Sequence, residues 1–238
     1  MRFSTLLVGV IGLLGAASPV PASAQTQDQI DWCVNKDNAF APAVRINGCT
    51  ALIQSGRLSV QGLAKVYNNR CFAHNEAGEY DRALTDCDEA IRLDPEFALA
   101  YMNRGTAYGA KTDNDHAIAD LSEAIRLDPK SARAYYDRGK VYGAKGDNDR
   151  AISDDTEAIR LEPKFPFAYN NRGHAYRNKG DYEHAIADFN AAIQLDPKFA
   201  ISYCGRGLAK RAQGDAAGGN ADISKGRQLN PNIGSWCN

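Results

Sequence analysis

Apolar residues recur at helical spacing in two short stretches, and this pair of stretches returns every 34 residues from residue 64 onward. A turn such as KGD at 179–181 separates the two stretches. The second stretch closes with a hexapeptide that ends in proline, written AIRLDP, AIRLDP, AIRLEP, AIQLDP and GRQLNP. Because proline disfavours helical geometry in the residue before it, each hexapeptide is expected to end a helix. The hexapeptide is therefore the end of a structural module and not a catalytic motif.

Five blocks align in register, at residues 64–97, 98–131, 132–165, 166–199 and 200–233. Every block has tyrosine at its fourth position, arginine at its seventh, small residues at its eighth, twentieth and twenty-seventh, and proline at its thirty-second. Glycine supplies the turn at Gly78, Gly146, Gly180 and Gly214. The residues that follow include N-cap acceptors at Asp147, Asp181 and Asp215. A two-helix hairpin cannot bury its apolar face alone, so the blocks must stack on one another.

This register resembles the tetratricopeptide repeat, whose 34-residue pattern places an aromatic residue, a small residue, an aromatic residue, Ala, an apolar residue, Ala and Pro in that order. The resemblance covers residues 64 to about 233. It implies an all-α fold, a right-handed superhelix or α-solenoid of antiparallel helix hairpins. Residues 234–238 are left as a carboxy-terminal tail.

Residues 25–63 are expected to form a divergent amino-terminal helical hairpin. Cys33 and Cys49 are separated by the same 16 positions as Cys71 and Cys87, and CTALI at 49–53 matches CDEAI at 87–91. Four extra residues in SGRLSVQGLA interrupt the register before the first regular block.

Residues 1–24 are predicted to be a signal peptide. Arg2 precedes an apolar stretch from Leu6 to Ala17, and Ala22-Ser23-Ala24 forms a cleavage site before Gln25. The competing interpretation is a buried helix of the mature protein. The stretch is too short to span a membrane, so no membrane insertion is expected. The prediction is an exported protein in a bacterial periplasm.

Six cysteines lie in the predicted mature chain, and an even count in an oxidising compartment favours three disulfides. Six cysteines allow 15 pairings. Block numbering favours Cys33–Cys49 and Cys71–Cys87, because each pair links the two helices of one hairpin at equivalent positions. Cys204–Cys237 would then tie the last block to the chain end. The sequence contains no C-x-x-C motif, so neither a zinc site nor a thioredoxin-like redox pair is indicated.

Charge and motifs argue against several functions. The chain has 28 Lys+Arg against 29 Asp+Glu. It has no excess of basic residues, so its charge gives no indication of nucleic-acid binding. Four histidines are dispersed, and no metal site or cofactor is expected; they are His74, His116, His174 and His184. Neither a phosphate-binding loop nor a G-x-S-x-G motif is present, so we expect no enzyme. The oligomeric state stays open.

Arginine at position seven recurs together with aspartate at position twenty-three, as in Arg138 with Asp154. An anion-binding stripe of arginines is one interpretation, and a structural ladder of Arg–Asp pairs is the favoured one. Position twenty-four is apolar or cysteine in four blocks, but is Asp155 in the third. A lone buried carboxylate is costly, so either the site is wet or Asp155 belongs to a polar network.

In the family that the chain resembles, positions 2, 5, 9 and 12 of the first helices line a concave groove. The resemblance therefore implies groove residues Leu99, Met102, Arg133, Tyr136, Lys140, Phe167, Asn170, His174 and Arg177. Cations beside aromatic rings suit an acidic protein or peptide segment with an aromatic or aliphatic anchor. Asn68 and Phe72 stand at positions 5 and 9 of the first block, where they depart from the family's carboxylate clamp.

The favoured function is an exported, non-catalytic scaffold that binds a protein or peptide in this groove. Three alternatives stay open: a solvated groove with no defined ligand, a component of an envelope complex for polymer handling or secretion, and an enzyme or enzyme subunit. Binding of a partner peptide in the groove would favour the scaffold, and turnover without a partner would favour the enzyme.

Overall fold

The computed structural model describes residues 22–34 and 39–237, in which the regular elements are all helical, as the repeat pattern predicts. The predicted signal peptide lies outside these ranges except for residues 22–24. The first hairpin pairs α1 (Ala22–Val34) with α2 (Pro42–Gln54). Five more hairpins follow: α3 (Val60–Glu76) with α4 (Tyr80–Leu93), α5 (Ala98–Ala110) with α6 (Asn114–Leu127), α7 (Ala132–Ala144) with α8 (Asn148–Leu161), α9 (Pro166–Asn178) with α10 (Tyr182–Leu195), and α11 (Ala200–Ala212) with α12 (Ala216–Leu229). A 3₁₀ turn, η1 (Gly234–Cys237), ends the fold.

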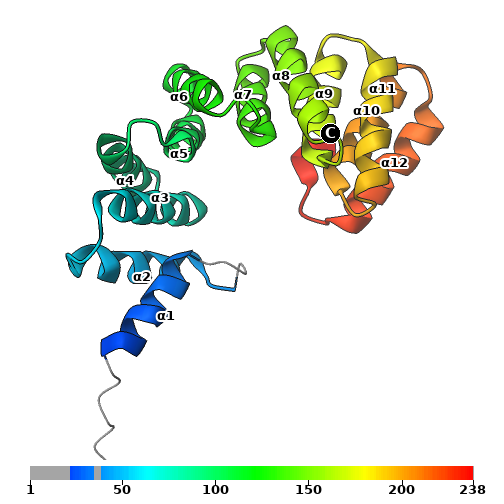
Figure 1. The fold of residues 1–238 in the computed structure, drawn as a ribbon. Coiled ribbons are helices and arrows are strands. Elements are labelled where there is room, and N and C mark those ends of the chain that lie inside the picture. Colours follow the sequence, from blue (N-terminus) through cyan, green and yellow to red (C-terminus); the bar gives the residue numbers. More distant parts are fainter. Residues whose placement is uncertain (1–21, 35–38, 238) are drawn as a thin grey trace, which may run out of the picture.

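The hairpins follow one another along an arc, with α5 on its inner side and α6 on its outer side (Figure 1). Successive odd-numbered helices from α3 to α11 contact each other, whereas the even-numbered helices contact only odd-numbered neighbours and η1 within the described ranges. The inner face of the arc is therefore built from the first helix of each hairpin, which makes it the concave face. None of the described helices has the length and apolarity needed to cross a bilayer.

Helix boundaries agree with the sequence register in four of the five blocks. Helices α5, α7, α9 and α11 begin at the first residue of their blocks and have 13 residues each. Helix α3 has 17 residues and begins at Val60, four residues before its block. The four extra residues of the sequence are thus one additional helical turn, and Ser59 caps it by accepting a hydrogen bond from the Gly62 amide.

The turns inside the hairpins require left-handed backbone. Four of them place glycine there, with φ between 74° and 98°, at Gly78, Gly146, Gly180 and Gly214. In the second block Thr112 takes this position with φ 62°, a conformation that costs a β-branched residue about 1 kcal/mol. The following aspartates cap the second helices as predicted, and Asp113 does the same in the second block.

Close approach of the two helices in a hairpin explains the small residues at positions eight and twenty. A Cβ atom added to Gly207 would lie 2.7 Å from the carbonyl oxygen of Gly219 and 2.9 Å from Cγ1 of Ile223. In the first block the same space holds the disulfide Cys71–Cys87. The related disulfide Cys33–Cys49 links α1 and α2, so the first two hairpins are each closed covalently at equivalent positions.

Each position-seven arginine forms a bidentate pair with the aspartate of its own repeat. Nε and Nη2 of Arg138 donate to the two carboxylate oxygens of Asp154, each at 2.8 Å. The same two bonds, with distances of 2.5–2.8 Å, join Arg70 to Asp86, Arg104 to Asp120, Arg172 to Asp188 and Arg206 to Asp222. Hydrogen bonding to Asp154 raises the pKa of Arg138. The arginines are therefore a structural ladder, as the favoured interpretation predicts.

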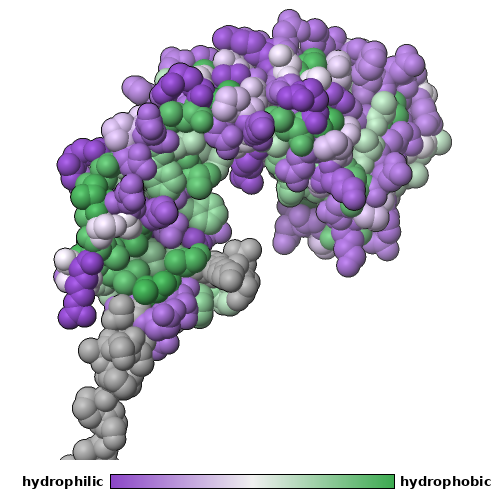
Figure 2. Space-filling view, viewed as in Figure 1, coloured by the Kyte–Doolittle hydropathy of each residue, from purple (hydrophilic) through white to green (hydrophobic). Residues whose placement is uncertain are grey.

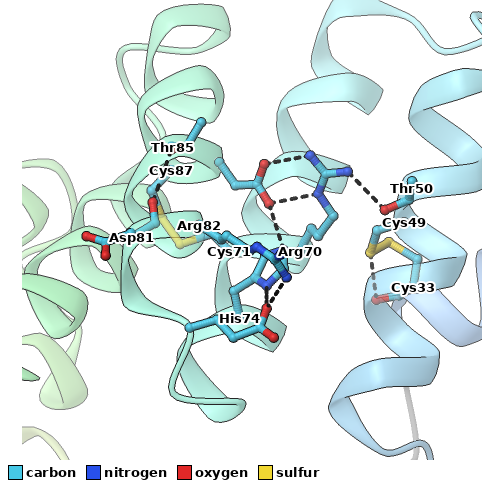
Figure 3. Close-up of polar contacts among 12 residues, drawn as sticks. Cys33, Cys49, Thr50, Arg70, Cys71, His74, Asp81, Arg82, Thr85 and Cys87 are labelled. Carbon is cyan, nitrogen blue, oxygen red and sulfur yellow. Dashed lines mark hydrogen bonds and ion pairs between the residues drawn. A yellow bond between two sulfur atoms is a disulfide. The ribbon is translucent and has the colours of Figure 1, made fainter.

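The third nitrogen of each arginine reaches the preceding repeat. Nη1 of Arg138 donates to the Ser122 hydroxyl at 3.0 Å. The other arginines have an acceptor at the same place, namely Thr50 for Arg70, Asp88 for Arg104, Thr156 for Arg172 and Asn190 for Arg206. Figure 3 shows Arg70 with its bond to Thr50 of the first hairpin. One guanidinium thus connects two helices of its own repeat and one helix of the repeat before it.

The carboxy-terminal tail closes the last repeat. Cys237 is disulfide-bonded to Cys204, and both side chains are buried. Ile233 and Cys237 pack with Ala200 and Ile223 in one cluster, which places η1 over the face that a following repeat would otherwise cover. All three predicted cysteine pairs are present.

The ladder generates a stability prediction. Arg138→Ala and Asp154→Ala should each lower the free energy of unfolding by about 2 kcal/mol, because each leaves a largely buried partner without its charge-assisted bonds. The double variant should lose less than the sum of the two. Chemical denaturation of the four proteins measures this cycle, and strictly additive losses would show that the pair does not interact.

The tail generates a second prediction. Cys204→Ser/Cys237→Ser should lower stability by about 3–4 kcal/mol on the chain-entropy estimate for a loop closed over a separation of 33 residues. Because η1 covers only the last repeat, amide hydrogen exchange should accelerate in α11 and α12 and change little in α5. Equal acceleration along the whole array would contradict a local cap.

Candidate functional site

Two adjoining hollows open on the concave face. The first lies between α3, α5 and α7, where Gly105, Gly109 and Val141 contribute to its lining. The second lies between α7 and α9, has a volume of about 550 Å³, and is lined in part by Gly143 and Ala175. Lys140 and Ala144 border both hollows, so the two hollows together form one groove across four consecutive repeats.

The second hollow carries two cations without a carboxylate partner. Lys140 is exposed, and Arg177 is half-buried on the opposite helix. Neither forms an ion pair with any residue of the described ranges. Burial lowers the pKa of Arg177 from its ordinary value because no nearby carboxylate compensates the guanidinium. The Lys140 charge acts on the nearby carboxylate of Asp137, so Arg177 carries the less compensated charge of the two.

Arg133, the third predicted groove cation, is already neutralised. Its Nε donates to the carboxylate of Asp137 one helical turn later at 2.8 Å, and its guanidinium lies 5.7 Å from the ring centre of Tyr136. Burial raises the pKa of Asp137, and the Arg133 charge opposes that rise. The i, i+4 spacing of the two residues in α7 is a sequence signal for this pair. The main role of Arg133 is therefore to pair with Asp137, which leaves little of its charge for a ligand.

An aromatic cluster lies near the amino-terminal ends of α7, α9 and α11. Phe167 is 48% exposed and meets Phe199 edge-on at 4.9 Å between ring centres. The Phe165 ring lies between the rings of Tyr136 and Phe167, with its centre 5.0 Å from that of Tyr136 and 6.0 Å from that of Phe167. Burial raises the pKa of Tyr136 to about 12, so its hydroxyl stays neutral. The sequence reasoning predicted Tyr136 and Phe167 but missed Phe165 and Phe199, which end their blocks in the connecting loops. The recurrence of phenylalanine at position 34, in Phe97, Phe165 and Phe199, was the available signal.

Of two further predicted groove residues, His174 lines the second hollow and Asn170 does not. The His174 ring packs edge-on against Phe189 at 5.0 Å between centres. Burial, with a smaller effect of Arg177, lowers the pKa of His174 to about 4, so the imidazole is neutral at neutral pH. The side-chain oxygen of Asn170 accepts a hydrogen bond from Ser202 at 2.8 Å. Both residues are therefore tied to neighbouring helices.

The amino-terminal part of the groove is more apolar. Leu99 is 49% exposed and Phe72 is 42% exposed, while Met102 is partly buried against the core. The Arg45 guanidinium lies over the Phe72 ring at 5.0 Å. Hydrophobic residues are also prominent over the amino-terminal helices in Figure 2, whereas hydrophilic residues dominate the outer edge of the arc. The groove thus changes from apolar to cationic along the array.

Asp155 is fully buried beneath the boundary of α7 and α9. The Asn171 amide donates to its Oδ2 at 2.6 Å, while no described residue donates to Oδ1. Burial raises the pKa of Asp155 well above its ordinary value of 3.8. Of the two interpretations of this position, the polar network fits, because Asp155 connects through Asn171 to the wall of the second hollow.

The histidines do not gather at a metal site. Within the described part of the chain, no three His, Cys, Asp or Glu residues come together as ligands. His116 and His184 instead bond the capping residues Asp113 and Asp181, each at 2.8 Å, and stack on Tyr108 and Tyr176. These two histidines therefore contribute to capping the amino-terminal ends of α6 and α10.

Comparison with known families matches the repeats directly. The family described as "Tetratricopeptide repeat" matches residues 64–97 and 166–199, and a second one with that description matches residues 132–165. A family described as "TPR repeat" matches residues 110–146. No curated protein matches the sequence.

Several solved structures have the same fold. A MamA protein superposes with a TM-score of 0.61 at 23% identity, over 72% of this chain and 94% of that one. YrrB, described as a TPR protein with an unusual peptide-binding site, superposes with a TM-score of 0.60 at 22% identity, over 79% and 95%. A tetratricopeptide repeat protein from Parabacteroides merdae superposes with a TM-score of 0.67 at 19% identity, over 85% of this chain and 78% of that one. These identities relate the folds alone.

Asp155 generates a pH-dependent prediction. Its pKa is higher in the folded chain than in the unfolded chain, so its contribution to stability is greatest below pH 4 and falls as the pH rises towards the folded pKa. Asp155→Asn keeps an acceptor for Asn171 but never ionises. The melting temperature of this variant should match the parent near pH 4 and exceed it by several degrees at pH 7. A constant difference at all pH values would contradict a neutral buried carboxyl group.

Proposed function

The chain belongs to the tetratricopeptide repeat family, and we propose that it is an exported, non-catalytic scaffold that binds an acidic segment of a partner protein in its concave groove. The observation that carries the proposal is the pair of cations on facing walls of the second hollow, Lys140 and Arg177, neither of which forms an ion pair with a described residue. By contrast, the five ladder arginines and Arg133 all have carboxylate partners. A ligand carboxylate would supply the charge partner that these two cations lack.

Exposed aromatic side chains on the same helices support an apolar anchor in the same ligand. Phe167 exposes nearly half of its surface and is held on both sides by Phe165 and Phe199. A pre-ordered aromatic ring loses little conformational freedom on binding, and such rings dominate interface energetics. Charge would govern the rate of encounter, and the aromatic cluster would govern the lifetime of the complex.

Export rests on the amino-terminal sequence and on cysteine use. All six cysteines are paired in the structure, which is typical of an oxidising compartment. The segment before Gln25 has the charge, apolar stretch and small residues of a signal peptide. The similarity to YrrB, whose description names a peptide-binding site, supports a peptide ligand for this array.

The proposal is tested with residues 25–238 and two labelled synthetic peptides of equal length. One alternates aspartate with phenylalanine, and the other replaces every aspartate with asparagine. Fluorescence anisotropy should show binding of the acidic peptide that weakens at least tenfold between low salt and 0.5 M salt, because salt screens exposed charges (about 4 Å Debye length at that concentration). The asparagine peptide should bind at least tenfold more weakly at low salt.

Variants assign this binding to the groove. Lys140→Glu/Arg177→Glu should weaken the acidic peptide at least 30-fold at low salt. The matched control Arg57→Glu/Lys225→Glu changes net charge equally at exposed positions off the groove and should change affinity less than twofold. Phe167→Ala should weaken binding about tenfold at every salt concentration. Equal binding by both peptides, or equal effects of the two charge reversals, would refute the proposal.

A further inference from the structure

Gly109 and Gly143 stand at the same position of the second and third blocks, in the last turns of α5 and α7. Gly109 lines the first hollow and Gly143 lines the second. The corresponding residues of the other blocks are Asn75, Arg177 and Arg211. Among the five blocks, glycine thus occupies this position only in the two central repeats of the groove, whereas Asn75 and Arg177 occupy it in the repeats on either side.

The backbone does not require glycine at these positions. Neither residue has a positive φ. Their carbonyl oxygens accept hydrogen bonds from Thr112 and Gly146, each at 3.0 Å. The carbonyl groups of Asn75, Arg177 and Arg211 accept the equivalent bonds at 3.0–3.1 Å. Residues with side chains therefore perform the same backbone role elsewhere in the array.

Helix packing does not require glycine there either. A Cβ atom on Gly109 would lie 3.5 Å from Cγ2 of Val141, and one on Gly143 would lie 4.0 Å from Cβ of Ala151. Both are ordinary van der Waals distances. At Gly105, by contrast, a Cβ atom would lie 2.9 Å from Cγ of Leu121. Since glycine is a poorer helix former than alanine, the fold itself gives no reason to keep Gly109 and Gly143.

We propose that Gly109 and Gly143 determine the specificity of the groove by keeping two side-chain slots open, one on each side of Lys140. This inference rests on the proposed function. The slots have apolar walls, formed by Leu121 and Val141 in the first hollow and by Ala151 and Ala175 in the second. They fit two bulky apolar side chains of one extended segment, and Lys140 between them fits an acidic residue.

A polar side chain also borders the first hollow. Asn75 lines this hollow, and its side-chain oxygen is buried without a hydrogen-bond donor among the described residues. Its amide nitrogen already donates to the Asn103 carbonyl at 2.8 Å. A buried acceptor without a donor is costly.

Repeat geometry sets the spacing of the two apolar residues. Packed neighbouring helices lie about 8–10 Å apart, and an extended peptide advances about 3.3 Å per residue. The two slots therefore correspond to ligand residues about three positions apart, with the acidic residue between them.

The test uses residues 25–238 and an immobilised array of synthetic ten-residue peptides. Each peptide carries one glutamate between two test positions, which hold Phe, Leu or Ala at a spacing of two, three or four residues. The parent protein should bind peptides with Phe or Leu at a spacing of three at least tenfold better than the Ala peptide. Gly109→Leu and Gly143→Leu fill the slots and should each remove this preference.

Two further sets of variants separate the slots from stability and position. Arg211→Leu introduces the same side chain at the same block position outside both hollows and should bind like the parent. Gly109→Ala and Gly143→Ala should melt at the parent temperature or up to about 3 °C higher, because alanine favours the helix. Lower melting temperatures would mean that stability requires the glycines and would overturn the proposal.

The outcomes also distinguish the slots from the groove. If the leucine variants keep the preference for Phe and Leu while Lys140→Glu/Arg177→Glu abolishes binding, the acidic-ligand function stands and the slots are refuted. If the parent protein binds no peptide of the array, both proposals fail. Loss of the preference in the leucine variants, with unchanged binding by Arg211→Leu, supports the slots.

Discussion

The guanidinium of the position-seven arginine sets the geometry of the whole array. Its Nε and Nη2 atoms join the two helices of one repeat through an aspartate, and its Nη1 atom joins that repeat to the one before. A tyrosine of the same helix covers the face of the guanidinium, as Tyr135 covers Arg138 at 5.9 Å. Because a guanidinium is planar and its donors have fixed directions, each copy of this contact holds neighbouring helices in the same orientation. The curvature of the array and its concave groove follow from that repeated orientation.

The same contact also determines which cations remain for a ligand. Five arginines are neutralised within the ladder, and Arg133 is neutralised by Asp137. Lys140 and Arg177 remain on the concave face without carboxylates. A nearly neutral composition therefore coexists with a locally positive groove, since the balance of charges is uneven in space. The buried Asp155–Asn171 bond lies directly below this region and couples the groove wall to the core.

The sequence predicted the fold well because its signals were identities at fixed spacing. Tyrosine, arginine and proline recur at the same block positions, so helix ends followed from counting. Two cysteine pairs share a separation of 16 residues, and the third pair was the one left over. The acceptor for Nη1 was not predicted because its residue type changes from repeat to repeat. The side chains at this place can all accept a hydrogen bond but differ in identity: Thr50, Asp88, Ser122, Thr156 and Asn190. The groove was less predictable because its properties depend on pairing across helices. Arg133 and Arg177 are both arginines at groove positions; the i, i+4 spacing to Asp137 was a signal for the pairing of Arg133, whereas the burial of Arg177 without an ion pair became visible only in the structure.

The sealed carboxy-terminal repeat makes the two ends of the solenoid unequal. Cys204–Cys237 holds the tail over the last hairpin, whereas α1 at the other end exposes Ile30 and Val34. A filament of solenoids needs two complementary open ends, because each copy must receive one neighbour and present a surface to the next. Within the described residues, the carboxy-terminal end is covered and the amino-terminal end exposes these two side chains. Association through the terminal hairpins would therefore join amino-terminal end to amino-terminal end about a two-fold axis, and growth would stop at two molecules.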